Sequence, residues 1–255
     1  MSPSRSKDPL VFSSYTIRLM IGAIALLFPV VVLLSAPGIT PSLSWSYYTG
    51  ARDLFVGLLF VIGAFLVSYQ GHKQTLQKKA AGKFRKWVGE NQETFVAMVG
   101  GVAAGAAAVA PTAKCFTADC LVPTAILHYV GATILFAATA YFCLVAFVGR
   151  VRAKLAADEG SRASKKTAKA LLAPKRLRIG VYLFCGWGIV LIMLASIVAA
   201  ITRFYPISNF TFWMETVSLE LFGFAWLTAS HYLPILTDES ERKKTPLEQA
   251  IRQSK

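Results

Sequence analysis

The sequence is poor in charged residues and poorest in acidic ones. Asp, Glu, Lys and Arg make up 16% of its 255 residues, whereas an average soluble domain has about 25%. Apolar residues make up 55%, above the usual share of about 45–50%. This composition excludes an ordinary soluble domain and favours a chain that lies in lipid.

The sequence also lacks the short motifs that mark common enzymes. It contains three histidines, and no two of them have the spacing of an HExxH or His-x-x-x-His zinc motif. It has no Walker loop, no GxGxxG motif before a helix and no G-x-S-x-G motif. We therefore expect no metal site and no cofactor, and the sequence does not support an enzymatic activity.

The chain has six long apolar runs. A helix needs roughly 20 predominantly apolar residues to cross a bilayer core of about 30 Å. The runs cover about residues 15–36, 53–69, 94–111, 125–148, 179–201 and 210–232. The predicted fold is all-α, a single domain of six transmembrane helices (1–255) with a charged tail over 233–255.

The basic residues predict how this bundle is oriented. Of the 27 Lys and Arg residues, 24 fall on one side of the six helices, in the N-terminal segment, two loops and the tail. The positive-inside rule makes that side, and both termini, cytoplasmic. The bias explains most of the net charge of +14. It favours the bilayer and its anionic headgroups as partners over nucleic acid, for which there is no motif.

The two large basic loops have different patterns. Residues 73–87 carry apolar positions at helical spacing among lysines, which predicts a short helix in the membrane interface. Residues 150–175 are rich in Ala and Lys and contain Gly160, a pattern that fits either a frayed helix or a flexible linker.

Cysteines and small residues add two structural expectations. Cys115 and Cys120 flank a short loop on the non-cytoplasmic side, where an oxidising compartment permits a disulfide; they either pair or stay free. In the third helix, Gly101 and Gly105 form a face that lets helices approach closely. Packing within the bundle is its expected use, and a homo-oligomer is the alternative.

The candidate functional residues are charges near the outer side of the helices, because charges inside a membrane are costly and seldom idle. Arg52 and Asp53 begin the second helix, and His128 lies near the outer end of the fourth. Glu215 lies one turn deep in the sixth helix and Glu220 near mid-membrane. The two glutamates point about 140° apart, so we do not expect them to share a pocket.

These residues suggest specific pairings. We expect Glu215 to pair with Arg52, because a buried carboxylate needs a cationic or hydrogen-bonding partner. Asp53 can accept a hydrogen bond from His128 of the fourth helix or from the hydroxyl of Tyr47, Tyr48 or Thr49, which lie just before it in the sequence. Such a cluster is either a structural network that locks helices together or the wall of a small ligand cavity.

One stretch resembles a known family. The segment Ser42–Gly57 contains SLS, then YYT, then RD and FVG. It is similar to the signature SIS-x-x-YYT-x-x-RD-x-FVG of an uncharacterised family of bacterial multi-pass membrane proteins (YYTxxRDxFVG type). Further similar stretches are His128–Tyr129, Ala140–Leu144, Phe212–Glu215 and Phe222–Trp226. The resemblance implies six helices and residence in the bacterial inner (plasma) membrane, and it implies no activity. The long basic loop and tail depart from it.

The leading functional hypothesis is a non-enzymatic multi-pass membrane protein. It would bind, sense or transport a small molecule, a proton or a lipid through the outer polar cluster. One alternative is an intramembrane enzyme acting on a lipid or lipid-linked substrate, with Asp53, Glu215 and His128 as acid–base groups. The other is a scaffold or accessory subunit whose basic loops recruit a partner.

Overall fold

The computed structural model describes residues 14–36, 38–71, 88–113, 122–160 and 165–231. Within these ranges the chain is helical and has no strand. Its elements, in chain order, are α1 (Ser14–Ser35), the 3₁₀-helix η1 (Ser44–Tyr48), α2 (Arg52–Ser68), α4 (Gln92–Val109), α5 (Pro123–Tyr141), the π-helix η3 (Phe142–Phe147), α6 (Val148–Gly160), α7 (Lys165–Thr202) and α8 (Phe210–Ala229).

Each of the six apolar runs is helical, and two of the helices are longer than predicted. The α5 helix continues through η3 into α6 as far as Gly160, and α7 already begins at Lys165. The linker interpretation of residues 150–175 is therefore wrong where the structure describes them. Ala, Lys, Leu and Arg are strong helix formers, which explains this extension. The loop with Cys115 and Cys120, residues 73–87 and the tail over 233–255 lie outside the described residues.

Four helical segments are long and apolar enough to cross a membrane: Tyr15–Ser35, Gln92–Val109, Pro123–Ala156 and Pro174–Thr202. The outer surface of α7 is strongly apolar, with Phe184 exposed by 71%, Leu191 by 62% and Ile201 by 77%. Soluble proteins rarely expose large contiguous patches of this kind to water. These features support the assignment as a helical membrane protein.

The helices pack through small residues. A Cβ atom at Gly101 of α4 would approach the carbonyl oxygen of Gly63 in α2 to 2.5 Å. A Cβ atom at Gly22 of α1 would lie 2.9 Å from the carbonyl oxygen of Gly223 in α8. Glycine at these positions lets the helix backbones touch. The small-residue face of α4 is thus used within the bundle, as its sequence predicts.

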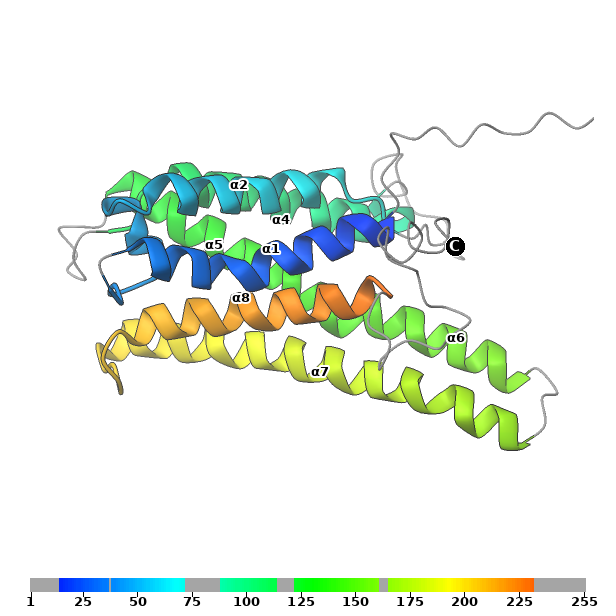
Figure 1. Cartoon of the computed structure of the whole chain (residues 1–255). Coiled ribbons are helices and arrows are strands. Elements are labelled where there is room, and N and C mark those ends of the chain that lie inside the picture. The colour runs from blue at the N-terminus through cyan, green and yellow to red at the C-terminus, as the bar shows by residue number, and fades with distance from the viewer. Residues whose placement is uncertain (1–13, 37, 72–87, 114–121, 161–164, 232–255) are drawn as a thin grey trace, which may run out of the picture.

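The bundle has two distinct ends (Figure 1). At one end lie η1 and the chain between α7 and α8; we call this the η1 end. At the other, α6 and the first half of α7 run side by side beyond the remaining helices; we call this the arm end. The two ends present different sets of polar side chains.

An aromatic core lies next to the arm end, on the side toward the η1 end. The indole of Trp226 in α8 is fully buried, and its ring centroid lies 5.1–5.7 Å from those of Tyr69, Phe142, Phe147 and Phe222. These rings come from the end of α2, from η3 and from α8. They pack the ends of three helices against one another, next to the polar residues of the arm end.

Candidate functional site

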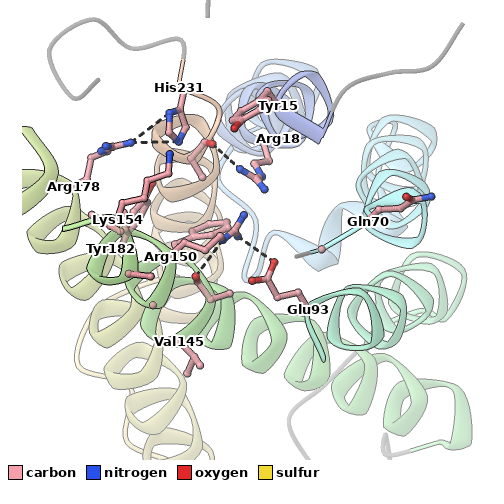
Figure 2. A pocket seen from close by; sticks show the side chains of 17 residues that line it. Tyr15, Arg18, Gln70, Glu93, Val145, Arg150, Lys154, Arg178, Tyr182 and His231 are labelled. Carbon is pink, nitrogen blue, oxygen red and sulfur yellow. Dashed lines mark hydrogen bonds and ion pairs between the residues drawn. The ribbon is translucent and has the colours of Figure 1, made fainter. Parts of the chain in front are cut away.

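The arm end holds a pocket of about 660 Å³ where α1, α4, η3, α6, α7 and the end of α8 meet (Figure 2). Four of its lining residues are cations: Arg18, Arg150, Lys154 and Arg178. Glu93 is the one acidic residue among the described lining residues. The excess of positive charge in this lining favours the binding of an anion.

Arg18 lies in the second turn of α1 and is only 8% exposed. Its guanidinium donates to the carbonyl oxygen of Ala229 at 3.2 Å and to the hydroxyl of Tyr69 at 2.8 Å. The rings of Tyr15 and Tyr69 each lie 5.4 Å from its charged carbon. Its Nε is buried and makes no hydrogen bond. The buried cation thus has one N–H group without an acceptor.

Arg150 is positioned by the π-helix that precedes it. A π-helix has a wider turn than an α-helix and often occurs at functional sites. Arg150 donates through Nε to the carbonyl oxygen of Ala146 in η3 at 3.2 Å, and its guanidinium lies 5.0 Å from the ring centroid of Phe147. These two contacts orient the side chain toward α4, where it faces Glu93 (Figure 2).

Glu93 lies in the first turn of α4 and is 2% exposed. Its Oε2 lies 3.4 Å from Nη2 of Arg150, an ion pair in which that nitrogen makes no hydrogen bond. Glu93 also attracts Arg18, while Arg150 and Arg18 are close enough to repel each other. Two guanidinium groups therefore share the negative charge of one carboxylate inside the pocket.

The third guanidinium comes from α7. Arg178 is fully buried, and its Nη1 lies 3.4 Å from Nδ1 and 3.3 Å from Nε2 of His231, which it faces in Figure 2. The His231 ring packs edge-on against Tyr15 at 5.3 Å between centroids. His231 has a φ of 61° and follows the end of α8. This left-handed residue lies directly after the end of α8 and lines the pocket.

These groups can recognise an oxyanion. Guanidinium groups are planar donors that match carboxylate and phosphate oxygens in pairs of hydrogen bonds. The remaining wall is mixed: Val145, Phe147 and Val151 are apolar, whereas Gln70 and His231 are polar. The pocket thus combines strong anion donors with a partly apolar wall.

The predicted outer cluster lies at the η1 end and is divided into separate contacts. Glu215 accepts hydrogen bonds from the backbone N–H of Ser44 at 3.1 Å and from its hydroxyl at 3.0 Å. His128 is 3% exposed and close enough to Glu215 to attract it. Its Nδ1 donates to the carbonyl oxygens of Ala107 at 2.8 Å and Ala110 at 2.9 Å. The structure thus brings Glu215 close to His128, whereas the sequence predicted Arg52 as the partner of Glu215 and Asp53 as an acceptor for His128.

Arg52 does not join that pair. Its guanidinium donates to the hydroxyl of Tyr47 at 2.9 Å and stacks on the Tyr47 ring at 4.5 Å. Among the described residues no ion pair joins Arg52 to Glu215, so the expected pairing is wrong. The reason is helix order: α2 packs on α1 and α4, whereas α8 packs on α1 and α7. Asp53 is exposed in the first turn of α2.

The other predicted residues have local roles. Tyr48 donates to the carbonyl oxygen of Thr112 at 2.6 Å, which connects η1 to the chain just after α4. Burial raises the pKa of the Tyr48 hydroxyl, and the phenols of Tyr47 and Tyr129 raise it further. Glu220 is half-buried on α8 and does not line the arm-end pocket. Glu215 lines a second pocket, at the η1 end, and Glu220 does not. The two glutamates are thus separate, as the helical geometry predicts.

Sequence reasoning missed the arm-end pocket. It counted Arg18, Arg150 and Arg178 among the charges that set membrane orientation, and it did not consider Glu93. A signal was present: Arg18 stands between Ile17 and Leu19 in an apolar run. A charge inside an apolar run is more informative than one in a basic loop.

Comparisons with protein-family models, curated proteins and solved structures found no match to this chain. The resemblance to the bacterial family with the YYTxxRDxFVG signature therefore stays a prediction. Within the described residues, no group of three or more His, Cys, Asp and Glu side chains could hold a metal ion.

Proposed function

We propose that this protein is a six-crossing membrane protein with both termini in the cytoplasm, and that its arm-end pocket binds the phosphate group of a ligand. The 24-to-3 distribution of basic residues supports this orientation, which places the arm end at the cytoplasmic surface. In a bacterial cell this membrane is the inner membrane. The pocket then lies at the cytoplasmic face of the bilayer.

One observation carries the binding proposal: the environment of Arg18. A buried guanidinium is costly unless it is paired and hydrogen-bonded. Arg18 is nine-tenths buried, has an unused Nε donor and shares Glu93 with Arg150. A bound phosphate would supply the missing negative charge and the missing acceptor.

Phosphate reaches this surface from two sources, the headgroup of an inner-leaflet lipid and a soluble phosphate compound. The pocket chemistry is the same for both, because the guanidinium groups contact the phosphate oxygens alone. Binding is the function proposed here. Sensing, transport, an intramembrane enzyme and a scaffold stay predictions, and each could use this site or the outer one.

The test compares Arg150→Gln with Arg152→Gln. Both substitutions remove one charge from α6, but Arg150 lines the pocket and Arg152 is exposed outside it. The measurement is the thermal unfolding midpoint of purified protein, which rises when a ligand binds the folded state. In one series, inorganic phosphate is added to the protein in neutral detergent. In the other series, phosphatidylcholine nanodiscs with and without phosphatidic acid are compared.

We expect stabilisation of the wild type and of Arg152→Gln, and an affinity about 10–100-fold lower in Arg150→Gln, the effect of losing a hydrogen bond to a charged group. Stabilisation by inorganic phosphate identifies a free anion as sufficient. Stabilisation by phosphatidic acid alone identifies a lipid headgroup. Equal responses of Arg150→Gln and Arg152→Gln in both series would contradict the proposal.

A further inference from the structure

A second pocket, of about 530 Å³, lies at the η1 end between α5, α7 and α8. Its volume falls within the range of about 300–1,000 Å³ that ligand pockets occupy. It is at the opposite end of the bundle from the arm-end pocket and shares no lining residue with it. Its ligand is therefore a separate question from the function proposed above.

The pocket is elongated along the helices. Along α7 the lining residues extend from Ile192 to Arg203, which directly follows the helix, and Tyr205 adds to the lining beyond it. At about 1.5 Å per residue this stretch is about 16 Å long. A bilayer core is about 30 Å thick, so the pocket reaches about as deep as one leaflet. This depth fits a molecule that lies parallel to the lipid chains.

The chemistry of the wall changes with depth. Arg203 directly follows the last residue of α7, is exposed and stands at the pocket mouth. Glu215 and Ser218 lie in the second and third turns of α8, deeper than Arg203. The deep end is apolar, with Phe136 and Ile192. The order from mouth to base is a cation, then hydrogen-bonding groups, then an apolar wall.

The two charged groups are both available to a ligand. No ion pair joins Arg203 to Glu215 within the described residues. Glu215 accepts two hydrogen bonds from Ser44 and one from the backbone N–H of Leu43, which leaves about one of the roughly four acceptor positions of a carboxylate for a ligand. A ligand with a negative group at the mouth and a donor below it therefore meets complementary partners in the right order.

We propose that this pocket binds a single-chain phospholipid of the lysophosphatidic acid type. Its phosphate pairs with Arg203, its glycerol hydroxyl donates to Glu215, and its acyl chain lies against Phe136 and Ile192. Ile197 of the same wall is 49% exposed on the surface of α7 that faces the bilayer, which gives a chain a lateral route into the pocket.

The first experiment tests whether the headgroup is read. Purified protein in neutral detergent is titrated with oleoyl-lysophosphatidic acid or with monooleoylglycerol, which has the same chain and lacks the phosphate. Native mass spectrometry counts the bound lipid. We expect the wild type to bind the phosphate-bearing lipid about tenfold more tightly. We expect Arg203→Gln to reduce this preference, with any remainder coming from the arm-end pocket. Arg203 is exposed, so its replacement does not disturb the core.

The second experiment tests where the chain binds. Ala132→Phe fills the pocket from α5, whereas Ala195→Phe adds the same ring to the exposed surface of α7 outside the pocket. We expect Ala132→Phe to weaken binding of both lipids at least tenfold and Ala195→Phe to retain it. Thermal unfolding of both variants checks that they fold.

Three results would overturn the proposal: no preference for the phosphate-bearing lipid in the wild type, an unchanged preference in Arg203→Gln, or unchanged binding in folded Ala132→Phe. The site is separated from the arm-end pocket by Arg150→Gln, in which we expect the preference to persist. Loss of the preference in that variant would assign the lysolipid to the arm end and contradict a site at the η1 end.

Discussion

Glu93→Gln is the substitution that most sharply probes the charge balance of the arm-end pocket. It keeps the size of the side chain and removes the one negative charge among the described lining residues. Arg18 and Arg150 then repel each other without a shared carboxylate between them. We expect the folded state to lose stability and to gain affinity for an added anion.

The size of the loss follows from burial. Removing one partner of a buried ion pair costs about 3–5 kcal/mol. Glu93 is almost fully buried but the Arg150 side chain is 23% exposed, so the lower end, about 3 kcal/mol, applies. For a protein of this size that corresponds to a fall of about 6–12 °C in the unfolding midpoint.

The assay is thermal unfolding in neutral detergent with and without inorganic phosphate. Phosphate should raise the midpoint of Glu93→Gln more than that of the wild type, because ligand stabilisation grows with affinity. The matched control is the double variant Glu93→Gln with Arg150→Gln, which removes both charges and should recover part of the stability. A Glu93→Gln protein that is as stable as the wild type, and whose midpoint phosphate raises by no more than that of the wild type, would refute the reasoning.

Two further predictions concern packing and pH. Gly101→Ala should destabilise the bundle by about 1–3 kcal/mol, because its Cβ meets the Gly63 backbone. Gly105→Ala should be neutral, because its Cβ meets only a side chain at 3.8 Å. Chemical or thermal unfolding of both variants measures the difference. Tyr48 has a raised pKa in the folded protein, so its contribution to stability is present below about pH 10 and is lost as the pH rises through the folded value. Tyr48→Phe should therefore show a smaller fall in unfolding midpoint above that pH than the wild type, and equal falls would contradict the assignment.

The apolar runs predicted the helices well because a helix in lipid must be long and apolar wherever it lies. They did not predict which helices are neighbours, since hydropathy contains no information on the order of packing. The expected Arg52–Glu215 pair failed for that reason: α1 lies between α2 and α8. The proximity of Glu215 and His128 was not predicted for the same reason, although both residues were placed near the outer ends of their helices.

The arm-end pocket was hidden by the topology signal itself. Lys and Arg residues at the cytoplasmic ends of helices orient a membrane protein, and the same residues can line a site when helix ends converge. Only packing separates the two roles: Arg18 is buried against Tyr69, whereas Arg152 of the same basic set is exposed. The π-helix that positions Arg150 has no sequence signature that we could use.

The most direct test of the central claim is to locate a bound oxyanion. Crystals of the purified protein grown with tungstate, a phosphate-like anion, would give an anomalous signal at the metal atom. The account predicts a peak in the arm-end pocket between Arg18 and Arg150, and its loss in Arg150→Gln but not in Arg152→Gln. Peaks confined to other parts of the surface, with this pocket free of anion, would contradict it.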